Sequence, residues 1–350
     1  MKVHLPVRPA ILARQTYEAP GEGRRGKIRL DFNENTTGCS AAARRAIARL
    51  TAKDIATYPE YQAPTRELAR AFGVRPDELL LTNGGDDALR VFFDTFVEPG
   101  SHILICEPTF PMYRYYAEIA GARVEALRFG PNMEYPLANA LAALKKRPRV
   151  FFVTNPNNPT GTLVPKKDLE KLLRAATHTV VVVDEAYVEF SGVSAIPWVR
   201  THPQLFVART FSKAAGLAGL RLGAVIGCRK SLALVRRAMP PYPVNMAALV
   251  AAVAALNERE TMARYVQSTK QRREWFASEL RKHRARVFPS AGNFLLADFG
   301  EQGPALFRKL ARYDILVRER SKDLGPGYAR ITIGTQAEMQ KFLRLLRERD

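Results

Sequence analysis

Seven short apolar runs alternate with longer helix-forming segments between residues 79 and 226. The four consecutive valines at 180–183 are the clearest run, because such a run is typical of a strand buried on both faces. Helix-forming stretches such as 165–175 separate several of the runs. This alternation predicts a mostly parallel seven-stranded sheet with helices on both faces. The expected strands are 79–82, 102–106, 123–129, 149–153, 180–183, 205–208 and 223–226.

The pattern changes at the proline-rich segment 240–243. A long helix-forming region follows from Asn245 towards Leu280, and the last helix carries apolar residues at an amphipathic spacing from Met339 to Leu346. Between them the sequence indicates strands near 287–288, 294–297, 315–317 and 329–333, with a helix near 304–312. We therefore expect three parts. They are an N-terminal arm over 1–30 packed on the small domain, a large domain over 31–240, and a small α+β domain over 241–350 with a long interdomain helix near its start.

The composition excludes several function classes. The net charge of +20 could indicate a nucleic-acid partner, but acidic residues are interleaved with the basic ones along the whole chain. An anionic small substrate explains the charge better. The three cysteines lie far apart, and neither they nor the five histidines form a metal-binding pattern. The start lacks an apolar signal core, and the longest apolar run, 246–256, is too short for a bilayer. We expect a cytoplasmic protein that binds neither metal, membrane nor nucleic acid.

The segment from Thr210 to Gly223 is the strongest chemical signal. Lys213 follows two hydroxyl residues in a Gly/Ala-rich stretch, directly after an expected strand. A lysine near other cations or away from water can form a Schiff base, because its pKa falls. Thr210, Ser212 and Arg221 could hold a phosphate at such a turn. The segment therefore indicates pyridoxal phosphate, although an exposed loop lysine remains the simpler interpretation of Lys213 alone.

Other chemical candidates also follow expected strands, where ligands of parallel sheets bind. A buried Asp184 could keep a pyridine nitrogen protonated, although strand-end aspartates often only cap helices. Phe110 could stack on a planar ring, or belong to the core. The glycine-rich turn at 83–87, before an expected helix at 88–96, could present N–H groups to an anion. The Asn-Pro-Asn-Asn-Pro-Thr-Gly segment at 155–161 could simply be a turn.

The order of these motifs is more specific than any one of them. A glycine turn, an aromatic turn, NPNNPTG, DEAY and TFSK, with an arginine eight positions later, resembles the fold-type I aminotransferases that use pyridoxal phosphate. Within them the chain is most similar to the histidinol-phosphate aminotransferases, and the resemblance covers nearly the whole chain. It rests also on Tyr17 before Pro20-Gly21, Asn33-Glu34-Asn35, Tyr58-Pro59, Leu217 to Gly223 and Arg330 to Gly334.

The resemblance implies a role for each matching residue. Lys213 would form the Schiff base and move the proton, Asp184 would pair with the ring nitrogen, and Phe110 would stack on the ring. Asn158 and Tyr187 would bond the ring hydroxyl. The phosphate would be held by Thr210, Ser212, Arg221, the backbone at Gly85 and Asp86, and Tyr58 of a second subunit in a homodimer. Arg330, helped by Arg318 and Tyr17, would bind the carboxylate of glutamate or 2-oxoglutarate, or the phosphate of histidinol phosphate.

Four positions depart from the family pattern. Gly85 stands where serine or alanine is usual, Thr36 replaces a proline, Pro243 replaces an asparagine, and Phe110 replaces a tyrosine. None of them touches the Schiff-base chemistry. The first three leave the exact substrate open, and the alternatives are an aminotransferase for aromatic or other amino acids and a threonine-phosphate decarboxylase. A nucleic-acid-binding protein with a pseudo-enzyme core is a further alternative, which the intact lysine, aspartate and arginine argue against.

Overall fold

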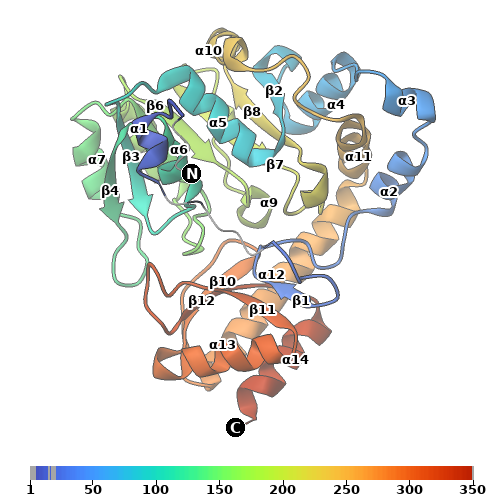
Figure 1. The fold of residues 1–350 in the computed structure, drawn as a ribbon, viewed down its shortest axis with the longest axis vertical. Coiled ribbons are helices and arrows are strands. Elements are labelled where there is room, and N and C mark those ends of the chain that lie inside the picture. The colour runs from blue at the N-terminus through green and yellow to red at the C-terminus, as the bar shows by residue number, and fades with distance from the viewer. Residues whose placement is uncertain (1–4, 15, 17–20, 349–350) are drawn as a thin grey trace.

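The computed structural model describes residues 5–14, 16 and 21–348. Two sheets lie one above the other along the long axis of the molecule, and each carries its own helices (Figure 1). The upper sheet has seven strands and the lower sheet has five. The long helix α12 (Arg259–Lys282) runs from the upper part into the lower part. The layered α/β architecture is the one that the strand–helix alternation predicts.

The seven strands of the upper sheet are those expected from the sequence, with ends that differ by one or two residues. Their order across the sheet is β2-β8-β7-β6-β5-β3-β4. All pairings are parallel except those of β8 with β2 and with β7. The strands are β2 (Leu79–Thr82), β3 (His102–Glu107), β4 (Arg123–Arg128), β5 (Val150–Thr154), β6 (Val180–Asp184), β7 (Leu205–Thr210) and β8 (Gly223–Gly227).

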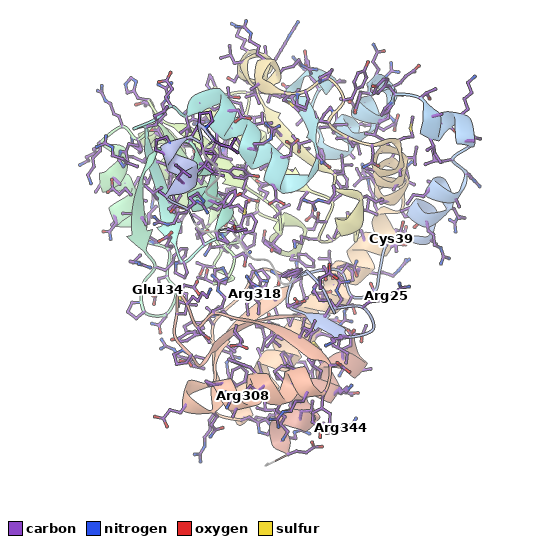
Figure 2. All side chains as sticks on the ribbon, viewed as in Figure 1. Arg25, Cys39, Glu134, Arg308, Arg318 and Arg344 are labelled. Atoms are coloured by element: carbon purple, nitrogen blue, oxygen red, sulfur yellow. The ribbon has the colours of Figure 1, made fainter. Side chains whose placement is uncertain are left out.

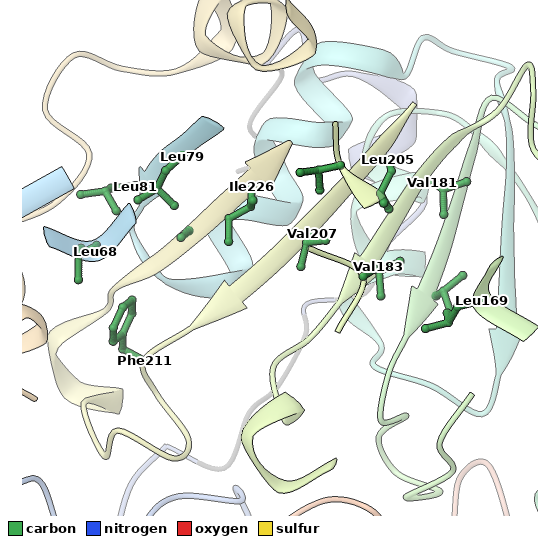
Figure 3. Close-up of a cluster of buried hydrophobic side chains, with 14 of the residues drawn as sticks. Leu68, Leu79, Leu81, Leu169, Val181, Val183, Leu205, Val207, Phe211 and Ile226 are labelled. Carbon is green, nitrogen blue, oxygen red and sulfur yellow. The ribbon is translucent and has the colours of Figure 1, made fainter. Parts of the chain in front are cut away.

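Helices bury both faces of this sheet, as the valine run on β6 illustrates. Val181 and Val183 belong to one apolar cluster with Leu169 (Figure 3). Val182 belongs to a separate cluster on the other face, together with Phe92. The surrounding helices are α2 (Ala41–Ala48), α3 (Ala52–Ala56), α4 (Gln62–Phe72), α5 (Gly84–Phe96), α6 (Met112–Ile119), α7 (Leu137–Leu144), α8 (Lys166–Ala175), α9 (Val188–Ser191), α10 (Arg229–Val235) and α11 (Met246–Asn257). The burial of alternate valines on opposite faces explains why the run has no polar positions.

The lower sheet is mostly antiparallel, with the order β1-β11-β12-β10-β9. Its strands are β1 (Ile28–Leu30), β9 (Arg286–Val287), β10 (Phe294–Asp298), β11 (Ile315–Glu319) and β12 (Tyr328–Thr332). Phe276 of α12 packs against Met339, Phe342 and Leu343 of α14 (Gln336–Arg347), and α13 (Gly303–Arg312) adds Leu310 to the same cluster. The amphipathic spacing of the last helix thus marks its buried face.

Two local features differ from what the sequence suggests. The helix-forming region after residue 245 is split, because Glu258 leaves the helical conformation with φ −93° and ψ 48° between α11 and α12. The predicted tight turn at 83–87 is wrong, since α5 already begins at Gly84. The carboxylate of Asp87 accepts a hydrogen bond from the backbone N–H of Asn83 at 2.9 Å. The glycines therefore belong to the first turn of the helix.

The N-terminal residues contact both halves of the molecule. The short helix α1 (Pro9–Leu12) is followed by Arg14, which pairs with Glu118 of α6 and lies 4.2 Å from the centre of the Tyr115 ring. Farther along, β1 pairs in parallel with β11 of the lower sheet. In the part of the chain that the structure describes, no helix combines the length and the apolar character needed to cross a membrane.

Candidate active site

A cavity of about 680 Å³ lies between the carboxyl edge of the upper sheet and the lower sheet. Strands β5, β6 and β7 end at its wall, as ligand sites of parallel sheets require. Its size lies within the usual range for small-molecule sites, about 300 to 1,000 Å³. Twelve of the residues singled out in the sequence line it, namely Gly85, Asp86, Phe110, Asn158, Asp184, Tyr187, Thr210, Ser212, Lys213, Arg221, Arg318 and Arg330.

Two residues of the sequence prediction stand apart from this group. Tyr58 does not line the cavity; its side chain is 76% exposed and stacks on Tyr242 with 4.4 Å between ring centres. Tyr17 lies outside the described residues. The roles that the resemblance implies for Tyr58 and Tyr17 therefore stay predictions.

Lys213 lies in the loop that connects β7 to β8. Its Nζ donates a hydrogen bond to the backbone carbonyl of Phe32 at 2.8 Å and lies 5.7 Å from the centre of the Tyr187 ring. The loop packs tightly against the chain at Gly38, because a Cβ on Gly216 would lie 2.7 Å from the Gly38 carbonyl oxygen. Gly216 also has a positive φ of 70°, which side-chain-bearing residues rarely adopt. These contacts hold the lysine amine at the cavity wall.

Asp184, at the end of β6, is a half-buried carboxylate at the cavity wall, without a charged partner in direct contact among the described residues. The Tyr113 hydroxyl donates to one oxygen at 2.6 Å, and the Ala186 backbone N–H donates to the other at 3.0 Å. Burial raises the pKa of Asp184, whereas these two hydrogen bonds and the Lys213 charge lower it. A cation placed in the cavity beside Asp184 would favour its ionised form. The protonated ring nitrogen of pyridoxal phosphate fits that requirement.

A group of hydrogen-bond donors lies where the first turn of α5 meets the loop after β7. The Thr210 and Ser212 hydroxyls lie 3.0 Å apart, and the first-turn N–H groups of α5 have no intrahelical acceptor. Arg221 borders the same place and pairs with Asp86 at 3.0 Å. A Cβ on Gly84 would lie 2.5 Å from Arg221 Nη2, whereas one on Gly85 would make only an ordinary contact with Thr210. This donor set fits a phosphate group.

Asn158 and Tyr187 bind partners other than the ring hydroxyl that the resemblance implies for them. The Asn158 side-chain oxygen accepts from Arg330 Nη1 at 2.5 Å, and the Tyr187 hydroxyl accepts from the Asn33 side-chain amide at 2.9 Å. Both residues are buried at the cavity wall. Their predicted bonds to a cofactor remain untested, and the observed ones link the lower sheet to the upper one.

The lower sheet contributes guanidinium groups to the cavity. Arg330 on β12 lies directly opposite Arg318 on β11, and Figure 2 shows Arg318 between the two sheets. Arg330 donates to Asn158 and to the Asp31 carbonyl oxygen, while its buried Nε has no partner among the described residues. Burial, together with the positive charges of Arg320 and Arg318, lowers the pKa of Arg330 to about 10. This end of the cavity is suited to an anion.

Sequence reasoning missed three residues of the site. Tyr113 lies three residues after Phe110, and the sequence gives it no role of its own, yet it is fully buried and binds Asp184. Arg320 lines the cavity two residues beyond Arg318. Glu34 also lines it and is held by Arg24 and Arg29. Because side chains two residues apart on a strand point to the same face, the sequence of β11 could have indicated that Arg320 lies beside Arg318. No local sequence signal indicates the contact between Tyr113 and Asp184.

Comparison with known proteins identifies the class of the chain. Residues 25–346 match the family described as aminotransferase class I and II, and the chain belongs to this family. Aminotransferases of this family use pyridoxal 5′-phosphate, so the chain is an aminotransferase with this cofactor and the fold-type I architecture. The cavity is lined by a lysine, a strand-end carboxylate and a group of donors suited to a phosphate, which is a set of groups that such an enzyme could use.

Several of the similar proteins are named histidinol-phosphate aminotransferase. The histidinol-phosphate aminotransferase of Geobacillus sp. (strain WCH70) is 33% identical over 326 residues, which cover 91% of this chain and 89% of the relative. That of Geobacillus thermodenitrificans (strain NG80-2) is 35% identical, with 91% and 89% covered. The solved structure of histidinol-phosphate aminotransferase from Sinorhizobium meliloti, in complex with pyridoxal-5′-phosphate, shares the fold with a TM-score of 0.88. It is 23% identical, and the likeness covers 99% of this chain and 98% of that one.

Proposed function

We propose that this aminotransferase transfers the amino group of L-histidinol phosphate to 2-oxoglutarate in L-histidine biosynthesis. The products would be imidazole acetol phosphate and L-glutamate. One observation carries the proposal: a single cavity holds Lys213 and Asp184 at one end and a group of arginines at the other. The name that the relatives share supports the particular donor.

Different residues of the chain would contact different parts of the cofactor. Asp184 would face the ring nitrogen, and the pair would be stable because each charge favours the other. The first turn of α5 at Gly85 and Asp86, with Thr210, Ser212 and Arg221, would hold the phosphate. Phe110 would lie against the ring, with Asn158 and Tyr187 near its hydroxyl. When bound, pyridoxal phosphate supplies an aldehyde for the donor's amine and a ring that accepts the electrons of the broken C–H bond.

Lys213 would carry the proton. Its Nζ is held at the cavity wall by the Phe32 carbonyl, within reach of the space between Asp184 and the arginines. In the first half-reaction, Nζ would remove the proton from the amine-bearing carbon of the donor. In the second, it would deliver a proton to the corresponding carbon of the new amino acid. The same amine thereby serves both directions.

Arg330 would fix the anionic end of each substrate. Its guanidinium is buried, is oriented by Asn158 and the Asp31 carbonyl, and lies opposite Arg318. A guanidinium fork binds either a carboxylate or a phosphate through paired hydrogen bonds, so one site could serve both half-reactions. Tyr17 would help from the N-terminal arm.

We further propose that the enzyme is a cytoplasmic homodimer in which Tyr58 reaches the cofactor phosphate of the second subunit. Tyr58 and Tyr242 form an exposed stacked pair, of the kind that interfaces between subunits cover. The division into an N-terminal arm over 1–30, a large domain over 31–240 and a small domain over 241–350 is likewise part of the proposal.

The function is tested by assaying the cofactor-loaded protein with several donors side by side. The donors are histidinol phosphate, phenylalanine, tyrosine and O-phosphothreonine, each with and without 2-oxoglutarate, while glutamate and carbon dioxide are followed. We expect glutamate to form fastest from histidinol phosphate and only with 2-oxoglutarate present. Preference for phenylalanine or tyrosine would contradict the donor. Carbon dioxide from O-phosphothreonine would instead indicate a decarboxylase.

A further inference from the structure

Three arginines share one face of the paired strands β11 and β12. Arg318 and Arg330 are direct partners in the register, and Arg320 continues the ladder because its N–H donates to the Tyr328 carbonyl at 2.9 Å. Residues two apart on a strand point to the same side, so Arg320 lies beside Arg318, and all three line the cavity. Like charges placed opposite each other destabilise a sheet. An anionic ligand would remove that cost.

The charges around these arginines do not balance. Arg320 pairs with Asp323, and the remaining nearby carboxylates, Asp31 and Glu34, pair with Arg24 and Arg29. Arg318 and Arg330, by contrast, form no ion pair with any residue that the structure describes, although both line the cavity. The surplus is two positive charges. A phosphate monoester carries about −1.5 to −2 at pH 7, whereas an α-carboxylate carries only one negative charge.

Arg320 also has hydrogen-bonding capacity that the folded chain leaves unused. Its side chain is 13% exposed, and its Nε is buried without a hydrogen-bond partner among the described residues. Buried donors are normally paired, and an unpaired one indicates a group that is absent. Arg330 has an unpaired Nε as well. Arg320 and Arg330 line the same cavity, and the positive charge of Arg320 contributes to lowering the pKa of Arg330.

We propose that Arg320 determines the preference of this site for a dianionic phosphate over a monoanionic α-carboxylate. A carboxylate has two oxygens, which one guanidinium fork at Arg330 can bind. A phosphate has three terminal oxygens and a second charge, which Arg320 would meet with its unused Nε. The inference rests on the proposed function and deepens it, because one site must accept both the phosphorylated donor and glutamate.

The two half-reactions separate this role from a general structural one. In Arg320→Gln, the KM for histidinol phosphate should rise on the order of 10- to 100-fold, because a charge-assisted hydrogen bond is lost. The glutamate half-reaction should change by less than about threefold. Inorganic phosphate should also become a weaker competitive inhibitor of the glutamate half-reaction. Arg320→Lys, which keeps the charge without the fork, should recover part of the phosphate preference.

Arg308→Gln is the matched control, since Arg308 is exposed on α13, away from the cavity (Figure 2). It should leave both half-reactions and the phosphate inhibition unchanged. Equal losses in both half-reactions of Arg320→Gln would overturn the proposal, because they would mean that Arg320 only holds the 320–323 turn through Asp323. Unchanged phosphate inhibition would overturn it too. If the unmodified enzyme did not turn over histidinol phosphate, the proposed function would be wrong. The comparison of phosphate inhibition between Arg320→Gln and the unmodified enzyme would still test the role of Arg320.

Discussion

The two ends of the cavity hold their charges in different ways. At the cofactor end, Asp86 pairs with Arg221, and the Asp184 carboxylate is fixed by hydrogen bonds from Tyr113 and Ala186. At the substrate end, Arg318 and Arg330 lie opposite each other on neighbouring strands, and positive charge is in surplus. The difference indicates a bound cofactor at one end, held by groups that the fold has already arranged. It indicates an exchangeable anion at the other.

The largest expected effect is at Lys213. Lys213→Ala should reduce turnover by several orders of magnitude, because Lys213 is the one lysine among the described residues that line the cavity. Both half-reactions should stop, which is measured by the absorbance change of the bound cofactor. Lys230→Ala, an exposed lysine on α10, is the control and should behave as the unmodified enzyme. Normal turnover in Lys213→Ala would remove the basis of the assignment.

Asp184→Asn should separate catalysis from stability. Without the carboxylate, the ring nitrogen loses its stabilising charge, and turnover should fall by roughly a hundredfold or more. Burial raises the pKa of Asp184, so its ionised form destabilises the cofactor-free fold above the pKa of the unfolded chain, near 3.9. The cofactor-free variant should therefore melt at a higher temperature than the unmodified chain at pH 7. The difference should shrink as the pH falls towards 4. If the variant melted at a lower temperature than the unmodified chain at pH 7, the ionised Asp184 would not be destabilising the cofactor-free fold.

Arg330→Gln tests the substrate end. We expect KM for both anionic substrates to rise by roughly a hundredfold, because two charge-assisted hydrogen bonds are lost. Cofactor occupancy, measured by absorbance after gel filtration, should remain that of the unmodified enzyme. A loss of cofactor instead would mean that Arg330 belongs to the other end of the cavity.

The smallest expected effects come from a matched pair of glycines. Gly84→Ala should weaken cofactor binding by about tenfold, because φ is 82° and the new Cβ would displace the Arg221 guanidinium. Gly85→Ala adds a Cβ that meets only Thr210 Cβ at 3.9 Å and should change the dissociation constant little. Equal dissociation constants for the two variants, from cofactor titration, would show that the Gly84 backbone does not shape the phosphate site.

The cofactor end was easier to predict from the sequence than the substrate end. Lys213, Asp184 and Thr210 each come after an apolar run that can be recognised in the sequence as a strand. Because the carboxyl ends of parallel strands meet at one edge of the sheet, these residues could be predicted to lie close together. The placement of Arg318 and Arg320 beside Arg330 depends on the register between β11 and β12, which no local pattern specifies. The contact between Tyr113 and Asp184 joins segments 71 residues apart. The start of α5 was misplaced because two glycines usually indicate a turn.

The most direct measurement compares kcat/KM for histidinol phosphate and for histidinol, the same donor without its phosphate, at saturating 2-oxoglutarate. If the surplus of arginines selects a dianion, the phosphorylated donor should be preferred on the order of a hundredfold or more, the equivalent of about two charge-assisted hydrogen bonds. The preference should fall as the salt concentration rises. Equal kcat/KM values for the two donors would contradict the account, because the arginines of the cavity would then contribute nothing to binding the phosphate of the donor.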